Sequence, residues 1–153
     1  MNDIINTDEI WMRKALVQAR LAADAGETPV GAVIVRANQV IGQAYNQVEL
    51  LKDPTAHAEM IAITQAAATL GDWRLLETTL YVTKEPCPMC AGAIQLARIP
   101  RVVFGATDPR GGGLLQCGEV IRGVLETECR TILQDFFKAL RQGQFPKPKT
   151  ASE

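Results

Sequence analysis

The sequence predicts a single α/β domain in which helices cover both faces of one sheet. Short apolar runs that are typical of strands alternate with longer segments of helical periodicity, and this alternation is characteristic of three-layer α/β domains. The chain has 153 residues, which is enough for one compact core without stabilising cross-links. We therefore expect one domain over residues 1–153, with its core at about 7–141 and a frayed tail at 142–153.

Helix and strand boundaries are indicated by capping residues, glycine and proline. A first helix is expected from Thr7 to about Asp24, with Asn6 as its cap and Glu9 three residues later. Its buried stripe should consist of Met12, Leu16, Ala19 and Ala23. The further elements, in chain order, are strands at 30–35 and 40–45 joined by a turn at 36–39, a helix capped by residues 53–55 and stopped by Gly71, strands at 80–83 and 101–104 around a helix at about 88–97, a strand at 120–121 and a helix at about 125–141.

Composition and charge narrow the class of protein. Hydrophobic residues make up 47% of the chain and charged residues 22%, and no apolar run approaches the roughly 20 residues of a membrane span. Residues 1–6 lack the order of a secretory signal, so we expect a cytoplasmic protein without a membrane partner. The net charge is −1, but residues 1–83 carry 6 basic and 10 acidic side chains and residues 84–153 carry 10 and 7. The second half could contact a polyanion, although a solvated surface with no partner explains the same count.

Two of the four cysteines have the spacing of a metal or redox site. Cys87 and Cys90 follow Pro86 at the start of an expected helix, where two thiolates can bind one zinc ion. The positive end of the helix favours the thiolate form of both. Alone, this pair is compatible with a zinc site or with a redox pair. Cys117 and Cys129 are better explained as small core or surface residues.

The only histidine favours the metal site. His57 lies at the start of the second expected helix, two residues before Glu59. A lone histidine is usually structural, and Glu59 could simply complement the helix dipole. Together with Cys87 and Cys90, however, these residues complete the pattern H-x-E followed by P-C-x-x-C, which is the signature of zinc-dependent nucleobase deaminases.

The ligand set is that of a catalytic zinc site. His57, Cys87 and Cys90 would leave the fourth zinc position to water, whereas structural sites are closed by four protein ligands. Zinc lowers the pKa of such a water to about 7. Attack on an amidine carbon also requires a proton on the ring nitrogen and another on the departing ammonia, and Glu59 can carry both.

With these motifs in place, the chain resembles the TadA family, bacterial tRNA adenosine deaminases that convert the wobble adenosine to inosine. The resemblance extends from about residue 27 to residue 141 and includes the two zinc-site motifs. The segments that carry it are Pro29-Val30-Gly31-Ala32-Val33, Asn46, Asp53-Pro54-Thr55-Ala56-His57-Ala58-Glu59, Glu85-Pro86-Cys87-Pro88-Met89-Cys90-Ala91-Gly92-Ala93-Ile94, Arg101-Val102-Val103-Phe104-Gly105-Ala106, Gly123-Val124-Leu125 and Glu128-Cys129.

This resemblance implies a cytidine deaminase-like fold with a mixed five-stranded sheet flanked by helices. It further implies a homodimer, one Zn²⁺ ion per subunit and a last helix that lies near the RNA. Asn46 could instead be a turn residue at the end of a strand, and Asp108 could belong to an ordinary turn before Pro109. The implied substrate-binding residues are Asn46, Val30, Ala58 and Asp108.

Two departures from the family bear on the substrate. Residues 113–118 lead almost directly into Glu119, where family members usually carry a longer stretch, and Lys84 stands where an apolar residue is more usual. A tRNA anticodon loop therefore competes with a free base or nucleoside of the guanine or cytosine type, and with single-stranded nucleic acid. A non-catalytic zinc-binding subunit is the remaining alternative. If RNA binds, we expect phosphate contacts from Arg98, Arg101, Arg110, Lys138 and Arg141.

Overall fold

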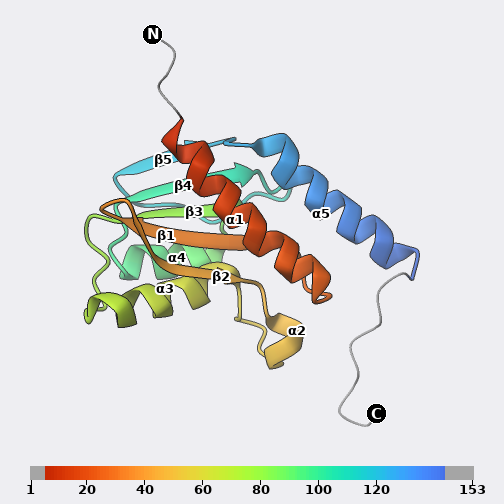
Figure 1. Cartoon of the computed structure of the whole chain (residues 1–153), viewed down its shortest axis with the longest axis horizontal. Coiled ribbons are helices and arrows are strands. Elements are labelled where there is room, and N and C mark those ends of the chain that lie inside the picture. Colours follow the sequence, from red (N-terminus) through yellow and green to blue (C-terminus); the bar gives the residue numbers. More distant parts are fainter. Residues whose placement is uncertain (1–5, 144–153) are drawn as a thin grey trace.

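The computed structural model describes residues 6–143 and shows one sheet with helices on both faces (Figure 1). Residues 144–153, which hold most of the expected frayed tail, lie outside the described residues, as do residues 1–5. Among the described helices, none is long and apolar enough to cross a membrane. The elements are α1 (Thr7–Asp24), β1 (Gly31–Arg36), β2 (Gln39–Tyr45), α2 (Val48–Leu51), α3 (Ala58–Leu70), β3 (Thr79–Lys84), α4 (Pro88–Leu96), β4 (Arg101–Ala106), β5 (Glu119–Arg122) and α5 (Glu126–Arg141).

The sheet is mixed, as the resemblance implied. Its strand order is β2-β1-β3-β4-β5. β1 pairs antiparallel with β2 and with β3, whereas β3, β4 and β5 run parallel to one another. Because Lys84 at the end of β3 lies opposite Ala106 at the end of β4, the segments that follow both strands emerge at one edge of the sheet.

Two separate cores hold the three layers together. α1 and α5 cover one face, where Met12 and Leu16 pack against Val33 and Val103. α3 and α4 cover the other face, where Ala58, Ala62 and Ala66 of α3 pack with apolar residues of the sheet and of α4. The small side chains of α3 bring this helix close to the sheet, and α3 is the helix that begins beside His57.

Two glycines allow the close contact between layers. A Cβ atom on Gly31 would overlap the backbone of α1 at Ala15, and one on Gly42 would lie 2.5 Å from the carbonyl oxygen of Ala62 in α3. Neither glycine needs its conformational freedom here; each is required because a helix backbone lies directly against its strand. The two helices are therefore held tightly on opposite faces of the β1–β2 hairpin.

Most predicted boundaries are confirmed, and the exceptions have local causes. Asn6 caps α1 by accepting a hydrogen bond from the amide of Asp8. Ala22 is fully buried in place of the expected Ala23, which is only half-buried. The hairpin turn is shorter than expected, because residues 36 and 39 still pair and only Ala37 and Asn38 adopt positive φ, as in a tight two-residue turn. The four-residue helix α2 was not predicted.

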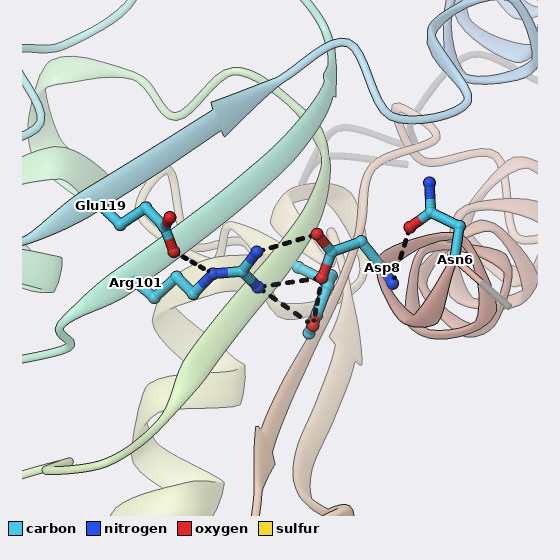
Figure 2. Close-up of polar contacts among 5 residues, drawn as sticks. Asn6, Asp8, Arg101 and Glu119 are labelled. Carbon is cyan, nitrogen blue, oxygen red and sulfur yellow. Dashed lines mark hydrogen bonds and ion pairs between the residues drawn. The ribbon is translucent and has the colours of Figure 1, made fainter. Parts of the chain in front are cut away.

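A partly buried ion-pair network joins α1 to the sheet at the edge opposite the ends of β3 and β4 (Figure 2). Arg101, the first residue of β4, donates to both carboxylate oxygens of Asp8 at 2.9 and 2.8 Å and to Glu119 of β5. The hydroxyl of Tyr81 also donates to Asp8, at 2.8 Å. The hydrogen bonds from Arg101 hold the pKa of Asp8 below its usual value, although partial burial opposes this effect. The network connects α1, β3, β4 and β5.

Loss of the Asp8 charge should destabilise the fold. Because the folded-state pKa of Asp8 lies below its unfolded value, the ion pair contributes stability above about pH 4, and this contribution is lost as the pH falls through the folded-state pKa. We expect Asp8→Asn to lower the free energy of unfolding at pH 7 by about 1–2 kcal/mol. Urea denaturation at pH 7 and near pH 3 measures this difference, which should shrink at the lower pH. Asp24→Asn, at the exposed end of the same helix, should change stability by less than about 0.5 kcal/mol, and an equal loss in both variants would contradict the assignment.

Candidate active site

The predicted metal ligands meet where α3 and α4 begin. His57 is the N-cap residue of α3, and Cys87 is the N-cap residue of α4 with Pro88 in its first turn. The expectation that residues 53–55 cap α3 is wrong: the carboxylate of Asp53 accepts from the amide and hydroxyl of Thr55. This local turn ends before the helix and leaves His57 at the cap position. The imidazole is therefore held at the helix end facing α4.

The distances between the three side chains suit a tetrahedral metal. The Nδ1 atom of His57 lies 3.6 Å from the Sγ atom of Cys87 and 3.4 Å from the Sγ atom of Cys90. All three ligand atoms lie within 4.8 Å of one another. Bond lengths of about 2.0 Å to nitrogen and 2.3 Å to sulfur at tetrahedral angles require a separation of about 3.6 Å. The three side chains thus form a group that could hold a metal ion. A redox pair of two cysteines would not require the histidine.

Burial shifts the pKa of two members of this group, Cys90 and His57. Burial, the Glu59 charge and the Cys87 side chain raise the pKa of the Cys90 thiol, which opposes the thiolate form that the helix end was expected to favour. Burial and the nearby charge of Lys84 lower the pKa of His57, which favours the neutral imidazole that binds metals. A metal ion would provide the positive charge that the thiolate needs, and its binding would release protons.

Glu59 lies in the first turn of α3, beside the metal ligands. Its side chain is only 3% exposed, and burial raises the pKa of this carboxyl. It lines a cavity of about 460 Å³ together with His57 and Cys87. This volume is sufficient for a nucleobase with its ribose. The cavity thus presents the buried acid Glu59 beside His57 and Cys87.

The structure brings only some of the expected substrate residues to this cavity. Val30 and Asn46 line it. The side-chain carbonyl of Asn46 accepts from the amide of Ala58 at 2.9 Å, so the Nδ2 amide group is the part of Asn46 that remains for a ligand. Ala58 is fully buried and donates its amide to Asn46; it positions Asn46. Asp108 lines an adjacent groove.

The basic residues proposed from the sequence for RNA separate into two groups. Arg110 lines both the cavity and the adjacent groove, and Arg141 of α5 lines the groove. Lys138 is exposed on the same helix. Arg98 precedes β4 and Arg101 begins it, at the opposite edge of the sheet, and the guanidinium of Arg101 is engaged by Asp8 and Glu119. Both residues thus lie away from the cavity, and we do not propose them as RNA contacts.

Sequence reasoning missed the support of the cavity wall. Glu27 is 2% exposed, and its two carboxylate oxygens accept from the amides of Glu49 and Leu50 at 3.0 and 2.7 Å. These bonds hold α2 beside the cavity, which Glu27 and Glu49 both line. The only sequence signal was an acidic residue between the helix stop at Gly26 and an apolar strand.

Comparison with known proteins shows relatives of the same fold and similar sequence. The family profile of MafB19-like deaminases matches residues 6–141. A tRNA-specific adenosine deaminase of Bacillus subtilis is 46% identical over 158 residues, which covers 95% of this chain and 98% of the relative. A structure from a study of A-to-I editing by tRNA:A34 deaminases at the wobble position of transfer RNA is 42% identical with a TM-score of 0.77, covering 81% of this chain and 99% of that one. A guanine deaminase structure from Bacillus subtilis is 41% identical with a TM-score of 0.63, covering 70% and 66%.

Metal content should depend on the three clustered ligands alone. We expect one zinc ion per chain by elemental analysis, and its loss in His57→Ala, Cys87→Ser and Cys90→Ser. Cys117→Ser is the matched control, because the Cys117 thiol donates to the carbonyl of Glu119 at 3.4 Å and not toward the cluster. Cys129→Ser should also keep the metal. Two zinc ions per chain, or loss of zinc in either control, would contradict the ligand set.

Proposed function

Because the chain belongs to the MafB19-like deaminases and to the family of tRNA-specific adenosine deaminases, we propose that it hydrolyses adenosine to inosine at the wobble position of tRNA. The observation that carries the proposal is 46% identity to such an enzyme over 95% of this chain. The reaction adds one water and releases one ammonia. The clustered ligands, the buried acid and the nucleoside-sized cavity are the parts that it requires.

Zinc is the metal that this donor set fits best. Two thiolates and one imidazole, from Cys87, Cys90 and His57, are soft or borderline ligands that suit tetrahedral zinc. Bound there, zinc would supply Lewis acidity and lower the pKa of water. The protein side chains carry out the remaining steps.

Glu59 is the proton-transfer residue of the proposal. It accepts one proton of the attacking water and delivers it to the purine N1 atom. It then accepts the second proton from the hydroxyl group added to the ring carbon and delivers it to the amino group, which departs as ammonia. Burial raises the pKa of Glu59 above its usual value, which makes this carboxylate a better proton acceptor than a solvent-exposed one. Its seclusion in the cavity also keeps bulk water from competing for these protons.

Asn46 and Val30 would hold the base. The Nδ2 group of Asn46 can donate to a purine acceptor, because its carbonyl is already bound to the amide of Ala58. Val30 supplies apolar surface in the same cavity. Asp108 lines the groove that adjoins the cavity, and its side chain is only 11% exposed. We assign it to the ribose side of the substrate.

Free guanine is the strongest competing substrate, because a guanine deaminase structure is 41% identical to this chain. The groove beside the cavity favours RNA instead. It is lined by Lys84, Arg110, Arg130 and Arg141 with Asp108, and a free base carries no phosphate for these cations. The presence of Glu59 argues against a non-catalytic subunit. With a tRNA substrate, the protein acts in the cytoplasm, and we propose a homodimer.

Replacing Glu59 tests the proton-transfer role. Glu59→Gln should retain zinc, because the side chain is not a ligand, and should lower kcat by about 10²–10⁴-fold. Deamination is measured with a tRNA anticodon stem-loop and with a panel of free bases and nucleosides, after metal loading. Glu128→Gln, which removes an exposed carboxylate on α5, serves as the control and should retain full activity. Substantial turnover by metal-loaded Glu59→Gln would refute the role.

Salt dependence tests the RNA substrate. Phosphate contacts make the stem-loop reaction fall steeply between about 50 and 200 mM salt, whereas turnover of a free base should hardly respond. Lys138→Ala/Arg141→Ala should reduce the slope by about one unit for each phosphate that the variant no longer binds. Lys14→Ala/Arg20→Ala on α1 is the matched double control. Deamination of guanine or cytosine, with none of the stem-loop at low salt, would overturn the tRNA assignment.

A further inference from the structure

The catalytic cavity and the groove beside it carry opposite charge. The acidic residues that line the cavity are Glu27, Glu49, Glu59 and Glu85, against the cations Lys84 and Arg110. The groove, about 530 Å³ in volume, has four cations and Asp108 as its acid. A neutral base is therefore tolerated in the cavity, whereas a phosphate group is favoured on the side of the groove.

Three residues belong to both hollows: Lys84, Arg110 and Phe137. Lys84 is the last residue of β3, three positions before Cys87, so its backbone position is set by the sheet. The positive charge of its ammonium acts to lower the pKa of His57 and of Glu59. The cation thus lies at the passage from the acidic cavity to the basic groove.

The ion pair between Lys84 and Asp108 can break without leaving Asp108 unpaired. The Nζ atom lies 3.5 Å from the Oδ2 atom of Asp108, and the Lys84 side chain is 27% exposed. Asp108 is held independently, because its Oδ1 atom accepts from the amide of Arg110 at 2.9 Å and its own amide donates to Glu85 at 2.9 Å. The Nε atom of Arg110 lies 3.6 Å from the same carboxylate. Lys84 can turn toward another anion while Asp108 keeps these partners.

We propose that Lys84 is a specificity-determining residue that binds a phosphate group directly adjoining the reacting nucleoside. The proposal rests on the RNA substrate proposed above and adds the contact that distinguishes a nucleotide within a strand from a free base. With the base in the acidic cavity, the neighbouring phosphodiester lies at the passage, and the ammonium of Lys84 neutralises it. The rest of the strand continues along the groove, where Phe137, which is 39% exposed, can stack against a neighbouring base.

A cycle of protein and RNA changes tests this contact. Anticodon stem-loops are prepared with a neutral methylphosphonate in place of the phosphate on the 5′ or on the 3′ side of the reacting adenosine. One of the two should lower kcat/KM of the wild-type enzyme by about fivefold and should have less than about a twofold effect on Lys84→Gln. Lys84→Arg should respond as the wild type does, because it keeps the charge. Lys14→Gln removes an exposed charge from α1 and should also respond as the wild type does.

The two proposals can fail separately. If the wild type deaminates the unmodified stem-loop and both methylphosphonates affect Lys84→Gln as strongly as the wild type, the phosphate contact is refuted. If the stem-loop is bound without being deaminated, the proposed function fails, and Lys84 is then judged by binding. Fluorescence anisotropy against salt should give Lys84→Gln a slope smaller by about 0.7, and equal slopes would refute the contact. Zinc content verifies the fold of each variant, and Lys84→Met repeats the test if Lys84→Gln loses zinc.

Discussion

The fold depends on the requirement that α3 and α4 begin at the same edge of the sheet. β3 and β4 run parallel, with α4 between them along the chain, so α4 must return across the sheet and begin where β3 ends. α3 precedes β3 and lies on the same face as α4. Their first residues therefore approach each other, and His57 lies within 3.6 Å of both cysteine sulfurs although 30 residues separate it from Cys87.

Features that depend on neighbouring residues could be predicted from the sequence. The cysteine spacing, the acid after His57 and the strand and helix periodicities all follow from neighbouring residues, and these features are present in the structure. Helix α2 was not predicted because four residues are too few to show a helical periodicity. It is held in place by hydrogen bonds to the carboxylate of Glu27, which is distant in the sequence. Arg101 was assigned to RNA because a charge count does not reveal a partner, and its partner Asp8 is 93 positions away.

The three clustered ligands and the residues that surround the cavity opening belong to different elements of the fold. This separation can explain why two substrate classes occur among structures of about 40% identity. The metal-binding group is set by helix ends packed on the sheet, and it would change little between relatives. The rim consists of α2, the segment between β4 and β5, and α5. Lys84, at the end of β3, adjoins this rim. Binding specificity can therefore change on a constant scaffold, as is general for loops on rigid sheets.

The glycine contacts at Gly31 and Gly42 have a consequence for internal motion. Helix backbones that rest directly on β1 and β2 leave no space in which either layer could slide, so opening of this region requires the layers to part altogether. Amide hydrogens of the hairpin should then exchange only through near-global unfolding, whereas those of α2 and of the segment after β4 exchange through smaller openings. The enzyme can thus open locally at α2 and at the segment after β4 around an incoming RNA strand, while the β1–β2 hairpin and the helices packed on it keep their positions.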